Sequence, residues 1–349
     1  MNKEVKSFPL GTLPYNSVDT AAVMLAKLYS DSPYLAILPA IDSEDTVINR
    51  TLKGIPGVKF KDGKLLLKTT SKQYQAELTS LDKAFNSAKK DDVDKFAIES
   101  IFLEKYFQLI KKFKSKTAYV NILGPFTLSQ LLNNLAEEQM LTDKSFRKLF
   151  IQAVCVKAMY MIKKIKETCP TTQPIIVLEE PMLGRFGDIK RINEDITAEL
   201  ITNMFTRVIE KIKECGALVC VQCMEKCDWQ IPINAGADII SYDAYNNPNN
   251  LCIIPESVTE FIERGGKINW GIVPTMTESI VKTLTIDYIE KRLSATFGGL
   301  IMAGVPAVKV YSSALVSVQG DTGHLPVIFA EKAIMLSTQM ASRLSAKGF

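Results

Sequence analysis

The sequence has a single histidine, His324, among 349 residues, which excludes any site that needs two or more imidazoles. It also lacks a long apolar run. The longest nearly apolar segment, 298–308, is much shorter than the ~20 residues that a transmembrane helix needs. The first residues, MNKEVKSFPLG, contain no apolar core of a signal peptide. We therefore expect no membrane span and a cytoplasmic location.

The chain has no strong excess of one charge. Lys and Arg number 42 and Asp and Glu 38, and the resulting net charge of +4 is spread along the chain. Without a basic stripe, a nucleic-acid partner is not expected. The seven cysteines are an odd number in a chain without a secretion signal, so we expect reduced thiols that pack as small apolar side chains.

Two periodicities alternate along the chain. Apolar residues recur at helical spacing in 103–110, 146–153 and 201–208, which predicts three amphipathic helices. Lys211, Lys213 and Gly216 predict the end of the third helix. Between helices lie short apolar runs, which are typical of parallel strands buried on both faces. These runs are 118–123, 175–178, 218–221, 238–242, 267–273 and part of 307–318.

This alternation predicts an α/β fold. No linker, repeat or low-complexity tract divides the chain. We therefore expect residues 1–349 to form one domain, a (β/α)8 TIM barrel, with an open doubly wound sheet as the alternative. Segment 58–69 departs from the alternation, because Asp62 and Gly63 separate two short apolar runs. It predicts a hairpin with a type I′ turn, part of an N-terminal hairpin and helical excursion.

Acidic and amide residues follow several predicted strands. In a barrel, chemistry gathers at the carboxyl ends of the strands. The run 175–178 leads into Glu179 and Glu180, 218–221 into Gln222, and 239–242 into Asp243. Each acid could instead be structural, as a cap on the next segment or an acceptor for loop N–H groups. For Trp229 and Trp270, packing in the core or at its rim is the alternative to ligand stacking.

Several short motifs occur in a characteristic order, and together they resemble the single-barrel proteins similar to the C-terminal half of cobalamin-independent methionine synthase. This family belongs to the superfamily shared with uroporphyrinogen decarboxylase. The resemblance extends from about Phe8 to the final helix. The motifs are Leu10-Gly11-Thr12-Leu13-Pro14, Gly124-Pro125-Phe126-Thr127, Leu178-Glu179-Glu180-Pro181, Asp228-Trp229, Asp238-Ile239-Ile240-Ser241-Tyr242-Asp243-Ala244-Tyr245 and Trp270-Gly271-Ile272-Val273-Pro274-Thr275.

The resemblance implies a barrel that transfers a methyl group to a thiol, such as that of homocysteine, held as a thiolate on zinc. Thr12 falls where the family has a substrate-contacting Ser, and Glu179 where an Asp contacts the substrate amino group. Glu180 matches a family Glu, and Asp243 falls near an acidic zinc ligand. From these correspondences and the strand ends we expect two catalytic residues, Glu180 and Asp243, and five substrate-binding residues, Thr12, Glu179, Gln222, Tyr245 and Trp270.

The metal ligands of the family are replaced. Gln222 stands at the zinc His, Met224 at the first Cys and Gly320 at the second Cys. A neutral amide and a thioether hold zinc poorly. A rebuilt site could use Cys220, Cys223, Cys227 and Asp243, but residues 220 and 223 would point to opposite faces of a continuous strand. We therefore expect metal-free, reduced cysteines, while His324 is a further candidate general base.

Three functions remain open. The leading one is a methionine-synthase-like methyltransferase with a degenerate zinc site, acting on a small thiol or amino-acid-like substrate with folate or a corrinoid protein as methyl donor. The second is a zinc-free enzyme similar to uroporphyrinogen decarboxylase, although the N-terminal segment lacks that family's paired Arg residues. The third is a non-catalytic barrel that binds a small molecule, a corrinoid or a partner protein.

Overall fold

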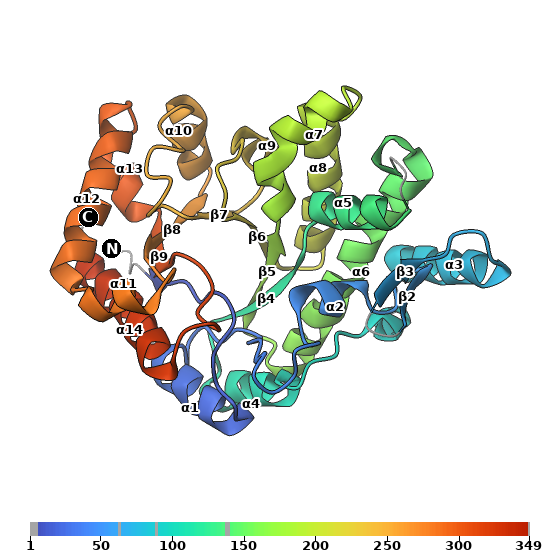
Figure 1. Ribbon diagram of the computed structural model, residues 1–349, viewed down its shortest axis with the longest axis horizontal. Coiled ribbons are helices and arrows are strands. Elements are labelled where there is room, and N and C mark those ends of the chain that lie inside the picture. Colours follow the sequence, from blue (N-terminus) through green and yellow to red (C-terminus); the bar gives the residue numbers. More distant parts are fainter. Residues whose placement is uncertain (1–5, 62–63, 88–89, 137–139, 348–349) are drawn as a thin grey trace.

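The computed structural model describes residues 6–61, 64–87, 90–136 and 140–347. Its centre is a curled sheet of seven parallel strands with helices on the outside, and the predicted α/β, TIM-barrel-like class is confirmed (Figure 1). The strands neighbour one another in the order β1 (Lys6–Ser7), β9 (Ala314–Val318), β8 (Lys267–Val273), β7 (Ile239–Tyr242), β6 (Leu218–Cys223), β5 (Gln173–Glu179) and β4 (Thr117–Leu123).

Segment 33–37 lies in the gap between the two edge strands. Tyr34 forms a parallel bridge with Tyr119 of β4, and Ile37 forms one with Thr12, just beyond β1. The N–H of Leu35 donates to the Tyr119 carbonyl (3.1 Å), and that of Leu13 to the Ile37 carbonyl (2.9 Å). The segment therefore occupies an eighth position around the curled sheet, without forming a regular strand.

A buried arginine explains why this segment is irregular. Arg50 of α2 (Val47–Leu52) donates to the carbonyl groups of Leu35 (2.9 Å) and Ala36 (2.8 Å). Its guanidinium also pairs with Asp45 at 2.5 Å, and both side chains are buried. Side-chain hydrogen bonds thus take the place of ladder bonds for these carbonyl groups.

The three predicted helices are confirmed as α4 (Leu103–Phe113), α6 (Lys144–Thr168) and α8 (Ala198–Glu214). Gly216, at φ +86°, follows the end of α8 in the left-handed region that favours glycine. The remaining helices of the described residues are α1 (Val18–Leu28), α3 (Lys72–Asn86), η1 (Lys90–Phe96), α5 (Pro125–Ala136), η2 (Met140–Thr142), η3 (Pro181–Arg185), α7 (Phe186–Ile192), α9 (Gln230–Asn234), α10 (Pro255–Glu263), α11 (Glu278–Thr283), α12 (Ile286–Met302), α13 (Ala307–Ser312) and α14 (Val327–Ala346).

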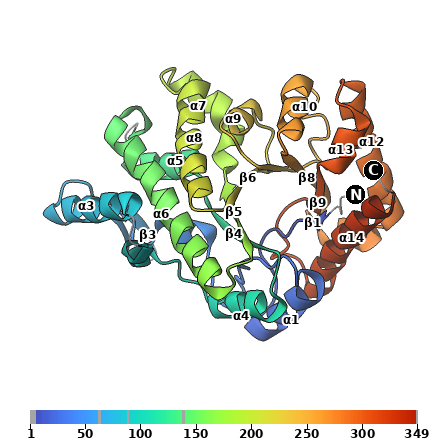
Figure 2. The same ribbon diagram turned by 180° about the vertical axis from the view of Figure 1, so that it is seen from behind.

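Two segments outside the regular alternation of strands and helices are the run 307–318 and the predicted hairpin. The run 307–318 is divided between helix α13 and strand β9, because its first half packs outside the sheet as a helix. The predicted hairpin is present as β2 (Val58–Lys61) and β3 (Lys64–Leu67), paired antiparallel. The residues of the predicted type I′ turn, Asp62 and Gly63, lie outside the described residues. The hairpin and α3 extend to one side of the barrel, beyond α6 (Figures 1 and 2).

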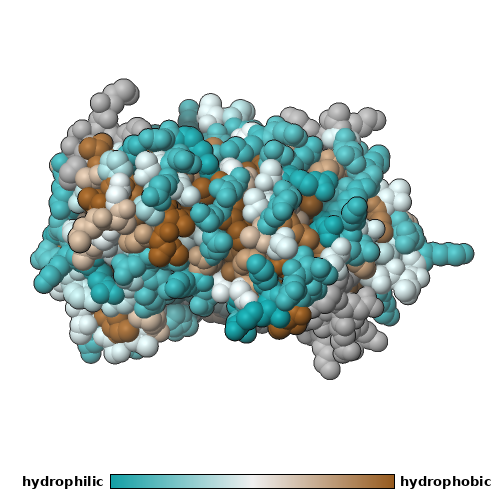
Figure 3. All heavy atoms as spheres, turned by 90° about the horizontal axis from the view of Figure 1, so that it is seen from above, coloured by the Kyte–Doolittle hydropathy of each residue, from teal (hydrophilic) through white to brown (hydrophobic). Residues whose placement is uncertain are grey.

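No helix among the described residues is long and apolar enough to cross a membrane. Hydrophilic side chains cover most of the face seen in Figure 3, and hydrophobic ones form small separate groups between them. All seven cysteines carry free thiols.

Candidate active site at the carboxyl ends of the strands

The barrel interior carries a layer of polar side chains. Glu179 pairs in register with Gln222, Gln222 with Ser241, and Ser241 with Asn269. Paired residues on neighbouring strands point to the same face, and side chains alternate along each strand. We define the inner polar layer as these residues together with Asn121 of β4 and Ser317 of β9; its members are Asn121, Glu179, Gln222, Ser241, Asn269 and Ser317.

Trp270 identifies the opposite face of the sheet. Its ring is buried against Tyr242 of β7 (centroids 5.5 Å apart) and Phe297 of α12 (4.9 Å). Since α12 lies outside the sheet (Figure 1), Trp270 faces the helices, and its neighbour Asn269 faces the interior. The structure therefore does not bring Trp270 to the mouth of the barrel, where a substrate contact was expected.

Glu179 is the acid of the inner polar layer. The amide nitrogen of Asn121 donates to its Oε1 at 2.6 Å. Burial raises the pKa of Glu179 to about 7, and the negative charge of Asp321 adds to the rise, whereas the Asn121 hydrogen bond and the Arg50 charge oppose it. A carboxyl group with this pKa exists in both protonation states at neutral pH, so it can both give and take a proton.

A cavity of about 370 Å³ opens beside Glu179, between the ends of β1, β4 and β5 and the segment leading to α2. This volume suits a small ligand. The polar side chains that line it are Thr12, Thr46, Asn121, Thr127, Glu179 and Asp321. Most of the remaining wall is apolar, with Tyr34, Ile37, Val47, Leu131 and Met182 among its residues. The cavity thus combines two carboxyl groups with a hydrocarbon surface.

The loop after β9 holds Thr12 in this cavity. Asp321 Oδ1 accepts the Thr12 N–H at 2.7 Å, and the Gly323 N–H donates to Thr12 Oγ1 at 3.0 Å. The Thr322 hydroxyl donates to the Thr12 carbonyl at 2.6 Å. Gly11 has φ +88°, and a Cβ there would lie 2.7 Å from Asp321 Oδ1. The Thr12 hydroxyl oxygen accepts from Gly323, and the same group has one hydrogen that it can donate to a ligand.

Glu180 lies outside the cavity. It is fully buried, and its carboxyl group accepts from the Phe126 N–H (3.0 Å), the Thr127 N–H (2.7 Å) and the Thr127 hydroxyl (2.7 Å). These groups belong to the first turn of α5, so Glu180 caps that earlier helix and makes no side-chain cap on η3, the next segment. Burial raises the pKa of Glu180 to about 7, although these hydrogen bonds lower it.

Asp243 and Tyr245 lie on the other side of the barrel mouth. Buried Asp243 accepts from the N–H and side-chain amide of Asn246 (2.9 and 2.6 Å) and from Gln319 Nε2 (2.8 Å). The Tyr245 hydroxyl is 3.2 Å from that of Tyr288, and Arg292 stacks 4.8 Å above the Tyr245 ring. Neither residue lines the 370 Å³ cavity.

The structure therefore brings two of the seven expected site residues, Thr12 and Glu179, to one cavity, with Gln222 on the strand beside Glu179. It adds Asn121 and Asp321, which the sequence analysis missed. Asn121 is a polar residue inside an otherwise apolar strand, and that interruption was a usable signal. Asp321 carried no signal of its own, because its position depends on the loop that packs on Thr12.

The described residues do not form a zinc site. In the described part of the chain, no group of three or more His, Cys, Asp or Glu residues is arranged to hold a metal ion. Cys220 shares its face with Gln222, whereas Cys223 points to the opposite face and its thiol contacts that of Cys227. Gln222, Met224 and Gly320, at the expected ligand positions, supply no thiolate or imidazole.

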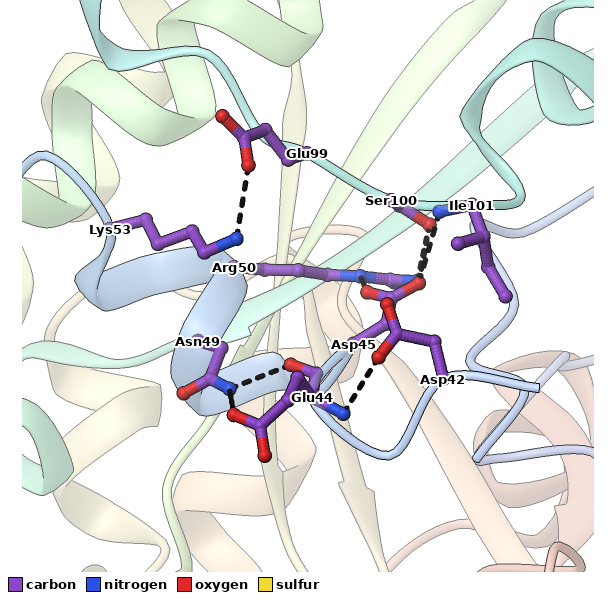
Figure 4. Close-up of a pocket in the computed structure, with 9 residues that line it drawn as sticks. All are labelled: Asp42, Glu44, Asp45, Asn49, Arg50, Lys53, Glu99, Ser100 and Ile101. Atoms are coloured by element: carbon purple, nitrogen blue, oxygen red, sulfur yellow. Dashed lines mark hydrogen bonds and ion pairs between the residues drawn. The ribbon is translucent and has the colours of Figure 1, made fainter. Parts of the chain in front are cut away.

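A second pocket, of about 300 Å³, lies around α2. Both of its cations are paired, Arg50 with Asp45 and Lys53 with Glu99 at 3.0 Å (Figure 4). Ser100 also donates to Asp45 at 2.8 Å. Arg50, held by Asp45, supports the irregular segment 33–37, so we assign this pair a structural role.

The sequence matches no protein-family model and no curated protein. Among solved structures, it is similar to a Bacteroidetes-affiliated GH5 cellulase linked with a polysaccharide utilization locus, at 11% identity and a TM-score of 0.44, covering 95% of this chain and 98% of that one. It is also similar to a chitobiase of Flavobacterium johnsoniae, at 12% identity and a TM-score of 0.30, covering 76% and 46%. At these values neither likeness bears on activity, and the TIM-barrel-like description rests on the strand order and on the bridges of segment 33–37.

Proposed function

We propose that the protein binds a small amino-acid-like molecule in the 370 Å³ cavity and uses Glu179 as its acid–base group. The observation that carries this proposal is a carboxyl group with a pKa of about 7 in a cavity of ligand size, bonded to Asn121 and close to the charge of Asp321.

The wall chemistry favours a ligand with an ammonium group and a short hydrocarbon part. An ammonium between Glu179 and Asp321 would offset the repulsion of the two carboxylates. The apolar side chains of Ile37, Leu131 and Met182 would cover the hydrocarbon part. A nearby cation lowers a carboxyl pKa, so Glu179 would release a proton when such a ligand binds at neutral pH.

The resemblance adds a reaction to this binding site, methyl transfer to a thiol such as that of homocysteine. A thiol with a pKa near 8.5 is only a few per cent ionised at neutral pH. Passing its proton to a carboxylate with the pKa of about 7 of the free protein costs about 2 kcal/mol, and each unit by which the bound ammonium lowers that pKa adds about 1.4 kcal/mol. The thiolate sulfur would then form the new S–C bond while the donor, a methylated folate or corrinoid, leaves with the electron pair. In this scheme Glu179 replaces metal activation of the thiol, and Asp321 pairs with the substrate ammonium.

A tetrapyrrole decarboxylase is less well supported. Its substrate carboxylates need cationic partners, whereas the cavity is lined by two acids. The nearby cation, Arg50, is already paired with Asp45 and two backbone carbonyl groups.

Calorimetry of homocysteine and methionine binding tests the binding step. Titrations in buffers with different ionisation enthalpies measure proton release, and we expect release at pH 7 by the wild type. Glu179→Gln should abolish the release and weaken binding about tenfold, whereas Glu256→Gln, a change of an exposed acid on α10, should alter neither. Absence of saturable binding, or proton release unchanged by Glu179→Gln, would overturn the proposal.

Methyl transfer is tested separately. Methyltetrahydrofolate and methylcobalamin are each supplied as donor with homocysteine, with and without a chelator. We expect turnover that resists the chelator and falls with pH below 7. Binding without turnover from either donor would leave a binding barrel and reject the transfer step.

A further inference from the structure

Within the described part of the chain, three buried amide oxygens at the barrel interior have no hydrogen-bond partner: Gln222 Oε1, Asn269 Oδ1 and Gln319 Oε1. Gln222 and Asn269 are at least nine-tenths buried, with exposed fractions of 8% and 0%. Burying an unpaired carbonyl oxygen is costly, so such groups call for a bound partner. The proposed role of Glu179 uses none of the three.

The orientation of the Asn269 amide is fixed. Its Nδ2 donates to Ser241 Oγ at 2.8 Å and to Ser317 Oγ at 2.9 Å. Ser317 gives its own hydroxyl hydrogen to the Val318 carbonyl at 2.7 Å, so towards Asn269 it can only accept. Rotating the amide would therefore set two acceptors against each other, and Oδ1 stays free.

The Gln319 amide is fixed in the same way. Its Nε2 donates to Asp243 Oδ2 at 2.8 Å, and a carboxylate can only accept. Asp243 is itself held by two hydrogen bonds from Asn246. Asp243 is therefore a positioning residue, which keeps Gln319 Oε1 turned away from itself and open to a donor.

Small residues stand at several inner positions of the strands near these oxygens. Barrel interiors are usually filled by bulky branched side chains, but here the inner positions of β7, β8 and β9 include Ser241, Gly271 and Ser317. The Asp243–Gln319 bond spans from the end of β7 to the end of β9. A Cβ on Gly271 would lie 2.7 Å from the Tyr242 carbonyl oxygen and 3.3 Å from Gln319 Cα. The backbone of β7 and of the segment after β9 therefore packs so close to residue 271 that only glycine fits there.

We propose that Gln222, Asn269 and Gln319 form a subsite for an organic cation with several N–H groups, an alkylammonium or a guanidinium. Three neutral acceptors suit a group that only donates, and the Asp243 carboxylate behind Gln319 adds a favourable field for positive charge. The subsite lies on the β6–β9 half of the barrel, outside the cavity that Thr12 and Glu179 line, and it does not depend on methyl transfer.

Binding of methylguanidinium and methylammonium, followed by NMR titration, tests the subsite. We expect saturable binding to the wild type and at least tenfold weaker binding to Gln222→Met, which keeps the side-chain length and removes the acceptor. The same change should raise the unfolding temperature of the free protein, because it removes an unpaired buried oxygen. Asp243→Asn should also weaken binding about tenfold, since Gln319 can then turn its amide.

Asn250→Leu is the matched control. Asn250 is a buried amide with unpartnered atoms in the loop before α10, so its replacement should raise the unfolding temperature without changing probe binding. Glu179→Gln should weaken homocysteine binding about tenfold and leave probe binding unchanged, which separates this subsite from the proposed function. Two outcomes would overturn the proposal: no saturable binding of either cation, or a lower unfolding temperature for Gln222→Met, which would show that ordered water alone occupies the site.

Discussion

Glu179 and Glu180 are neighbours in sequence and have the same raised pKa of about 7, yet their surroundings differ completely. Glu179 is the last residue of β5, lines the cavity and accepts a hydrogen bond from Asn121. Glu180 has turned to the opposite side and receives three hydrogen bonds from the first turn of α5. A raised pKa therefore identifies a buried carboxyl group, and only its access to a cavity makes it a candidate for chemistry.

The largest effect expected from this comparison is on stability. Glu180→Leu removes the acceptor for two backbone N–H groups and a hydroxyl at the start of α5, and it should lower the free energy of unfolding by about 3 kcal/mol. Urea denaturation measures it. Glu179→Gln, which keeps an acceptor for Asn121, should cost less than about 1 kcal/mol. Equal losses for the two variants would contradict the assigned roles.

Gly124→Ala should be nearly as damaging. A Cβ at this position would overlap the Glu180 carboxyl group, so either the carboxyl group or the helix must shift. We expect a loss of about 2 kcal/mol, a typical cost of overpacking a buried site. Combining Gly124→Ala with Glu180→Leu should be less than additive, because both changes disrupt one contact. Full additivity in a double-mutant cycle would show that Gly124 does not act through Glu180.

A smaller effect is expected on the pH dependence of stability, where only the effect of a bound ligand distinguishes the two residues. Both have folded pKa values raised above the unfolded value of about 4.5, so the folded state binds more protons between these values. Their contribution to stability is fully present below about pH 4.5 and is lost as the pH rises to about 7. The difference in unfolding free energy between wild type and Glu179→Gln should therefore fall over this window, and ligand should reduce the fall. A difference that stays constant with pH would contradict the raised pKa of Glu179.

The smallest effect is expected from metal removal. Since Gln222, Met224 and Gly320 provide neither thiolate nor imidazole, treatment with a chelator should leave ligand binding and the unfolding temperature unchanged. Elemental analysis before and after treatment is the matching measurement. About one zinc per chain, lost together with binding, would support the rebuilt cysteine site instead.

The sequence was most informative where a pattern is local. Apolar runs between amphipathic helices predicted β4 to β8 and the barrel-like class, and the position of Glu179 at the end of its apolar run made it a candidate site residue. Segment 33–37 was not recognised, because two isolated bridges and the Arg50 side chain hold it in place of a regular strand ladder. The sequence also did not show which side chains of a strand face the barrel interior. Trp270 faces α12 and Asn269 faces inward, and this depends on the register between neighbouring strands.

Contacts between distant segments explain the remaining differences. Asp321 joins the cavity because its loop packs on Thr12, more than three hundred positions earlier in the chain. Glu180 leaves it because the first turn of α5 offers three donors, which no spacing in the sequence reveals. Gly124 and Glu180 belong to two separate motifs of the resemblance, and the structure joins them in one contact.

The central claim is that Glu179 is an acid–base group poised near neutral pH in a ligand site. The most direct test is a ¹³C NMR titration of its side-chain carboxyl carbon, assigned by comparison with Glu179→Gln. The account predicts a midpoint near pH 7 in the free protein and a lower midpoint when an amino-acid-like ligand with an ammonium group is bound. A midpoint near 4.5 in the free protein, or one that no such ligand moves, would contradict it.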